Sequence, residues 1–172
     1  VFLPIYYQEA SIILKQASDK EFAPVFFGCD GMDGILSVEN FDTSLAEGLM
    51  LLTPFSTTEE SSKAFTEAYV AAYGIEPNQF AADSYDAIYA IKAAVEKAGV
   101  TADMSASDIC DALKPAMTEI SIDGLTGSDM VWNANGERRI RDAVIFLCTQ
   151  CVNSNETSER GSSNGRFPFF HV

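Results

Sequence analysis

Asp30 is the residue of this sequence whose surroundings most favour the binding of a ligand. A short apolar run over 24–27 ends at a glycine, with Asp30 just past it, and Gly31 and Gly34 follow. Glycines let the backbone turn sharply, and ligands of open α/β sheets bind at the carboxyl ends of the strands. A carboxylate there can hold a ligand. The alternative is a solvated turn residue that caps the next helix.

Tyr6 is the second candidate, because the elements around it predict where it lies. Val1–Tyr7 is predicted to be a strand, Gln8–Lys20 an amphipathic helix and Val25–Phe27 a second strand. This order predicts a βαβ unit with two parallel strands and a right-handed crossover. The carboxyl ends of the two strands then share one edge of the sheet. We therefore expect Tyr6 and Asp30 to reach the same small ligand.

The residues that common enzyme mechanisms need are missing. The single histidine, His171, lies near the C-terminus, so the body of the chain cannot form a Ser-His-Asp or Cys-His arrangement. No phosphate-binding loop or G-x-S-x-G is present. Asp30 and Asp33 lack the further oxygen ligands of a calcium loop. Cys148 and Cys151 form a lone C-x-x-C without the second pair of a zinc site. The sequence thus predicts no enzyme, no metal and no cofactor.

Charge and composition exclude further classes of protein. The chain has 172 residues, a net charge of −14 and 47% hydrophobic residues, which indicates a packed domain rather than disorder. Such an acidic surface repels the phosphates of nucleic acids, and we therefore expect no nucleic-acid partner. No apolar run is long enough to span a membrane. No signal peptide is visible, and the opening VFLPIYY is typical of a strand already under way, so we expect the natural start to lie upstream.

The middle of the chain continues the alternation of strands and helices. A short helix is expected over Ile35–Phe41 and a third strand over Leu49–Phe55. Thr57 and Glu60 have the spacing of a capping box, which predicts that a helix follows. Gly74 is expected to close that helix.

Two more helices are predicted before the last strands. The first spans Phe80–Ala98, and its inward stripe is predicted to be Ala81, Tyr85, Ile88, Ile91, Val95 and Ala98. Ser105, with Asp108 at the capping-box position, opens the second. Pro115 should kink or end this helix near Lys114.

The last predicted elements flank a turn. Asp129–Trp132 and Ala143–Leu147 are expected to be strands around Asn135-Gly136, a typical turn pair. From residue 149 on the chain is polar and patternless, so we expect 149–172 to be disordered.

With these elements in place, the chain resembles a branched-chain amino-acid-type solute-binding protein of ABC importers, of the leucine/isoleucine/valine-binding family. The matching stretches run from Val1 to about Glu137: VFLPIYYQEASIILKQA, FFGCDGMDG, SLAEGLMLLTPF, NQFAADSYDAIYAIKAAVEKAG and DGLTGSDMVWNANGE. The resemblance implies the C-terminal half of the type I periplasmic binding fold, an α/β fold with a parallel sheet flanked by helices. After Glu137, RRIRDAVIFLCTQC is not the usual ending of the family.

The resemblance also implies a division into lobes. Residues 1–53 and 127–148 would belong to the second lobe, 54–126 would be the closing helices of the first lobe, and 149–172 a tail outside the family. The sheet of the first lobe is missing. Helices that cover that sheet, such as Phe80–Ala98, are therefore expected to expose an apolar face.

Three residues of this chain match the ligand site of the family. An aromatic residue after the first of these strands and an acid after the next hold the ligand's α-ammonium group, and Tyr6 and Asp30 fall there. Phe80 matches an aromatic residue that lines the pocket from the start of the long helix. Their expected neighbours in the pocket are Tyr7, Cys29 and Met32.

The function that the resemblance implies is capture of an amino acid outside the cytoplasm. The chain would deliver branched-chain or other hydrophobic amino acids to a membrane permease, as a periplasmic protein or a cell-surface lipoprotein. One alternative is the ligand-binding sensor domain of a receptor or regulator with the same fold. A flavodoxin-like enzyme domain would need a phosphate-binding loop after a strand, and none of the first three predicted strands is followed by one.

Overall fold

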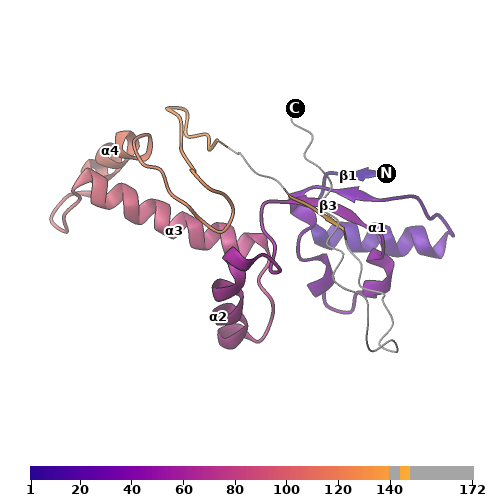
Figure 1. Ribbon diagram of the computed structural model, residues 1–172. Helices are drawn as coiled ribbons and strands as arrows, with labels where there is room; N and C mark the ends of the chain where they lie inside the picture. The colour runs from indigo at the N-terminus through magenta and orange to yellow at the C-terminus, as the bar shows by residue number, and fades with distance from the viewer. Residues whose placement is uncertain (140–143, 148–172) are drawn as a thin grey trace.

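The computed structural model describes residues 1–139 and 144–147, and the tail expected over 149–172 lies outside this range. A sheet with one covering helix forms one end of the molecule, and three helices form the other (Figure 1). In chain order the elements are β1 (Phe2–Leu3), α1 (Tyr7–Asp19), β2 (Phe27–Gly28), β3 (Met50–Thr53), α2 (Lys63–Tyr73), α3 (Gln79–Ala98), α4 (Ala106–Met117) and β4 (Val144–Leu147). Short 3-10 helices span Asp30–Met32, Ile35–Ser37, Thr43–Ala46 and Glu60–Ser62.

The sheet confirms the predicted α/β class. Its strands lie in the order β1-β2-β3-β4, with β1, β2 and β3 parallel and β4 antiparallel to β3. The strand predicted over Val1–Tyr7 is reduced to β1, because Pro4 has no N–H for the ladder and Tyr6 already precedes α1 as its N-cap residue. Pro54 ends β3, as expected. The first two strands therefore stop where the candidate ligand residues begin.

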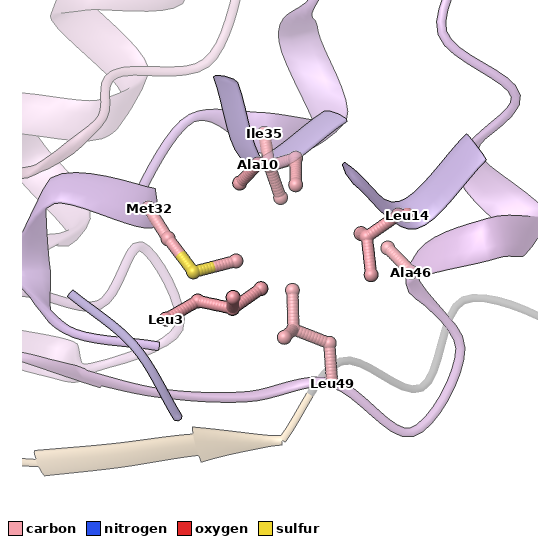
Figure 2. Close-up of a cluster of buried hydrophobic side chains, with 7 residues drawn as sticks. All are labelled: Leu3, Ala10, Leu14, Met32, Ile35, Ala46 and Leu49. Atoms are coloured by element: carbon pink, nitrogen blue, oxygen red, sulfur yellow. The ribbon is translucent and has the colours of Figure 1, made fainter. Parts of the chain in front are cut away.

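The core of the sheet end lies between the strands and α1. Helical spacing brings Ala10 and Leu14 of α1 onto its buried face, against Leu3 of β1. The 3-10 turns after β2 close the same cluster (Figure 2), whose seven buried side chains are Leu3, Ala10, Leu14, Met32, Ile35, Ala46 and Leu49. Burial of each leucine, isoleucine or methionine side chain contributes about 1.5–3 kcal/mol to the free energy of folding. This packing fixes the loop that carries Asp30.

The predicted start of α2 is wrong. The Thr57–Glu60 capping box does not form; the chain makes a 3-10 turn over Glu60–Ser62 instead, and α2 begins at Lys63. The buried Ser62 hydroxyl donates to the Glu59 carbonyl at 2.9 Å, which stabilises this tighter turn. Gly74 ends the helix in the left-handed conformation (φ 72°), as predicted.

The start of α4 is confirmed, but its predicted end is wrong. Ser105 accepts a hydrogen bond from the Asp108 N–H at 3.2 Å and donates one to its carboxylate at 2.7 Å. Pro115 does not end the helix, which runs on to Met117. A proline in the last turn removes only one helical hydrogen bond, and Ala116 just after it is buried in the cluster with α3.

The segment after α4 is less regular than predicted. Asp129–Trp132 is not a strand; its residues form only isolated antiparallel bridges, Ile122 with Met130 and Trp132 with Arg138. The turn at Gly136 is confirmed by its φ of 81°. The Asn133 carboxamide oxygen stabilises this turn by accepting hydrogen bonds from two backbone N–H groups.

The long helix α3 buries a different face from the predicted one. Its buried residues are Gln79, Ala82, Asp86, Ala90 and Ala94. Ile88 and Ile91 of the predicted inward stripe are 66% and 52% exposed, and Tyr85 and Tyr89 are exposed beside them. Near the end of α3, Ala94 faces inward and packs against Ala116 of α4. The larger apolar side chains form an exposed face, as expected for a helix without the first-lobe sheet.

We predict that this exposed face makes the 172-residue chain self-associate, because clustered apolar side chains gain free energy when they leave water. Replacing Ile88 and Ile91 by lysine should shift the chain toward monomer without loss of helical content. Sedimentation velocity over a range of concentrations measures the change. An Ile12→Lys variant, whose exposed residue lies on α1, is the control. A parent chain that is monomeric at all concentrations contradicts the prediction.

Candidate functional site

The carboxyl ends of β1 and β2 open onto a shared cavity of about 220 Å³. The two strands are parallel neighbours, so the residues that follow them meet at one sheet edge. The start of α3 closes the other side. The lining residues are Pro4, Ile5, Tyr6, Cys29, Asp30, Gly31 and Phe80. The structure thus brings together all three residues that the sequence singled out.

Tyr6 and Phe80 form the aromatic wall of this cavity. The Tyr6 side chain is held at the N-cap position of α1 and is 63% exposed. Its ring centroid lies 6.3 Å from that of Phe80, on the first turn of α3, and the Tyr7 ring lies 6.5 Å from Phe80. Such spacing is typical of interacting aromatic pairs. The wall joins residues more than 70 positions apart in the sequence.

The Asp30 carboxylate accepts no hydrogen bond from the part of the chain that the structure describes. Asp30 lies in the first turn of the 3-10 helix after β2, where no side chain caps the turn, and it is exposed. Asp30 is therefore a solvent-exposed turn residue that does not cap the turn after β2. A carboxylate beside an apolar wall, with its acceptor sites unused, is suited to a ligand that carries hydrogen-bond donors or positive charge.

Gly31 allows the turn to come close to the end of β1. A Cβ atom at this position would lie 3.0 Å from the Ile5 carbonyl oxygen and 3.3 Å from a ring carbon of Tyr6. The first neighbour is backbone and cannot rotate away. A side chain here would therefore push the Asp30 turn away from Tyr6.

The expected neighbours of the site have different roles. Cys29 lines the cavity, as predicted. Tyr7 packs on Phe80 but does not line the cavity. Met32 does not shape the pocket: it is completely buried in the core cluster (Figure 2). The Met32 side chain points back over Gly28. A Cβ atom at Gly28 would overlap the Met32 sulfur, so this close approach requires glycine.

Asp33 fixes the position of α3 relative to this edge of the sheet. Its carboxylate accepts a hydrogen bond of 2.6 Å from the backbone N–H of Gln79, the first residue of α3. The buried Gln79 side chain accepts a second one from the Thr53 hydroxyl, at the end of β3, at 3.0 Å. These two contacts place Phe80 opposite Tyr6. The sequence offered no signal for them, because they join residues 46 and 26 positions apart.

A second long-range contact fixes the segment after α4 to α3. The Asp86 carboxylate, only 5% exposed, accepts hydrogen bonds of 2.8 Å from the N–H groups of Leu125 and Thr126 and from the Thr126 hydroxyl. Arg138 donates to the Thr126 hydroxyl at 3.0 Å and to its carbonyl at 2.6 Å. A Cβ atom at Gly124 would lie 2.5 Å from the Asp86 carboxyl carbon, so this approach requires glycine.

Within 1–139 and 144–147, no group of three or more histidine, cysteine or acidic residues is arranged to hold a metal ion. In the same ranges no helix combines the length and the apolar character needed to cross a membrane.

The cavity lies at the carboxyl ends of parallel strands, which is where open α/β sheets bind their ligands. The sequence matches the family model described as periplasmic binding protein over residues 8–150. The chain belongs to that family. No curated protein matches it.

Two solved structures with a similar fold are described as binding proteins. LivJ of Streptococcus pneumoniae, described as a branched-chain amino acid transporter substrate-binding protein in complex with isoleucine, is 27% identical over 86% of this chain and 44% of its own, with a TM-score of 0.60. The leucine-binding protein LivK of Thermotoga maritima is 24% identical over 87% of this chain and 41% of its own, with a TM-score of 0.67. The chain thus spans less than half the length of these proteins.

We predict that Asp86→Ala lowers the free energy of unfolding by about 3 kcal/mol or more, because it leaves buried donors unpaired at two residues. Chemical denaturation followed by circular dichroism measures this loss. Asp111→Ala on α4 is the matched control, since its ion pair with Lys114 is exposed and contributes little. Equal losses in the two variants contradict the prediction.

We predict that the contribution of Asp33 to stability falls as the pH rises. Burial raises the pKa of Asp33 above 3.8 and outweighs the hydrogen bonds from the backbone of Gln79 and Gly34, which lower it. The folded state thus binds the proton more tightly than the unfolded state, so the contribution is largest below pH 3.8 and is lost as the pH passes the raised pKa. Asp33→Asn should gain stability relative to the parent between pH 3 and 7.

Asp42 serves as the control, because its pKa is shifted in the opposite direction. Hydrogen bonds from the Ser44 side chain and backbone lower the pKa of Asp42, so Asp42→Asn should lose stability relative to the parent as the pH rises. Denaturant titrations at several pH values measure both differences. A difference for Asp33→Asn that is constant with pH contradicts the prediction.

Proposed function

We propose that this chain is part of the extracytoplasmic solute-binding component of an ABC importer and binds an amino acid between two lobes. The observation that carries the proposal is the Asp30 carboxylate beside Tyr6 and Phe80 in the strand-end cavity, which accepts no hydrogen bond from residues 1–139 and 144–147. Family membership supports a binding protein and not an enzyme.

The proposed role of Asp30 follows from the chemistry of an α-ammonium group. This group has three N–H donors and loses its water when the lobes close on it. A carboxylate gives it a charge-assisted hydrogen bond worth about 1.5–3 kcal/mol. The Tyr6 hydroxyl supplies a neutral acceptor beside it, and its exposed side chain is accessible to a ligand.

The proposed ligand is an amino acid with a branched-chain or other hydrophobic side chain. Pro4, Ile5 and Phe80 give the cavity apolar walls that can bury such a side chain. Two similar proteins support this class of ligand: the solved structure of LivJ contains isoleucine, and LivK is described as leucine-binding.

The remaining parts of the proposal concern the whole protein. We assign residues 1–53 and 127–148 to the second lobe, which would contribute Tyr6 and Asp30, and 54–126 to the first, which would contribute Phe80. The loaded protein would deliver its amino acid to a membrane permease, from the periplasm or as a cell-surface lipoprotein. The pairing of β4 with β3 is compatible with this return of the chain to the second lobe.

We predict that Asp30→Ala weakens amino-acid binding by roughly a hundredfold or more, because a buried cation would be left without its counter-ion. Tyr6→Phe removes one neutral hydrogen bond and should cost about tenfold. Titration calorimetry with a panel of amino acids measures both, in a protein that combines these residues with a complete first lobe. An Asp30→Ala variant that binds as tightly as the parent would show that the carboxylate is only a turn residue.

A further inference from the structure

The chain crosses from the sheet to the three helices directly after β3 (Figure 1). We call residues 1–53 the sheet end and residues 54–126 the helix end. Thr53, the last residue of β3, is only 2% exposed. Its hydroxyl oxygen lies 3.3 Å from both the N–H nitrogen and the carbonyl oxygen of Phe55, on the other side of Pro54. This hydroxyl therefore lies at the crossing point between the two ends.

The same hydroxyl also contacts the start of α3. It donates to the side-chain oxygen of Gln79 at 3.0 Å, and Gln79 is 2% exposed. A hydroxyl has one proton to donate but can still accept, so Thr53 can bond Gln79 and the N–H of Phe55 together. The two backbones approach closely beside this contact, because a Cβ atom at Gly34 would lie 3.0 Å from the Asn78 amide nitrogen. The crossing segment and a distant helix thus meet at one buried point.

This point lies next to the ligand cavity without being part of it. Neither Thr53 nor Gln79 lines the cavity. Phe80, however, follows Gln79 directly, and its ring lies 6.3 Å from that of Tyr6 on the sheet end. Hinges between domains are a few residues at the ends of elements. A rotation of the helix end about the crossing would therefore move Phe80 relative to Tyr6 and open or close the cavity.

We propose that the hydrogen bond between Thr53 and Gln79, here called the hinge contact, sets the angle between the two ends. It holds them in the arrangement in which Tyr6 and Phe80 face one ligand, so both partners are positioning residues. The consequence for binding rests on the proposed function. Without the hinge contact the binding-competent arrangement is less populated, and the apparent affinity falls in proportion to that population.

Three variants separate the hinge contact from stability alone. Thr53→Val removes the hydroxyl at nearly constant shape and leaves the Gln79 oxygen buried without a donor. Thr53→Ser keeps the hydroxyl and should behave as the parent. The double variant Thr53→Val with Gln79→Met also lacks the hinge contact, but it contains no unpaired side-chain oxygen and recovers part of the lost stability. It therefore tests the angle between the ends even where Thr53→Val does not fold.

The angle is measured in the 172-residue chain by electron–electron double resonance. Spin labels are attached through non-natural residues at Lys15 of α1 and Glu96 of α3, both exposed, because the chain has four cysteines. Dilution with unlabelled chain keeps the measured distances intramolecular. The distance distribution should be narrow in the parent and in Thr53→Ser, and clearly broader in Thr53→Val and in the double variant.

Thr118→Val is the matched control, since its hydroxyl bonds the Pro115 carbonyl within α4 and joins no two ends. Its distance distribution should equal that of the parent. A distribution of equal width in the parent and the double variant overturns the inference, and so does a broad distribution in the parent.

A second measurement connects the hinge contact to binding. Titration with leucine, followed by NMR, should give the double variant a dissociation constant about tenfold larger than that of the parent. Thr118→Val should bind as the parent does. A broader distance distribution with unchanged affinity overturns the inference. If leucine does not bind the parent, the proposed function fails for this chain, and the distance distributions alone decide whether the hinge contact sets the angle.

Discussion

The site depends on one residue, Gln79, which ties the first turn of α3 to the sheet. Its backbone N–H is bound by Asp33 after β2, and its side chain accepts from Thr53 at the end of β3. The first N–H groups of a helix have no partner within the helix, so a carboxylate that accepts one also favours the positive end of the helix dipole. These hydrogen bonds hold Phe80 opposite Tyr6, and the Tyr7 ring packs on Phe80 as well.

The acidic residues of this region divide into those that support the structure and those that remain available. Asp33 and Asp86 are bound by backbone N–H groups, and a buried carboxylate that lost such donors would be costly. Asp30 accepts no hydrogen bond from the described chain. A net charge of −14 alone does not separate these roles. Only the identity of each partner shows which carboxylate is free for a ligand.

The sequence predicted what depends on local pattern. The βαβ order placed Tyr6 and Asp30 at one sheet edge. Gly74 correctly marked the end of α2, and Gly136 correctly marked a turn. It failed where distant contacts decide. Glu60 became part of a 3-10 turn instead of a cap. The contact between Asp86 and Thr126 leaves no trace in the pattern, because 40 residues separate them.

The burial of α3 shows why the periodicity of apolar residues alone did not identify the buried face of this helix. The helix carries apolar residues on two faces, alanines on one and isoleucines with tyrosines on the other, so the hydrophobic pattern fits either orientation. Close contact with α4 favours the small side chains, because two helix backbones approach nearer across alanine. That choice also turns Asp86 toward Thr126 and sets Phe80 against Tyr6. The orientation of one helix about its axis thus determines both the anchor of the later segment and the wall of the ligand cavity.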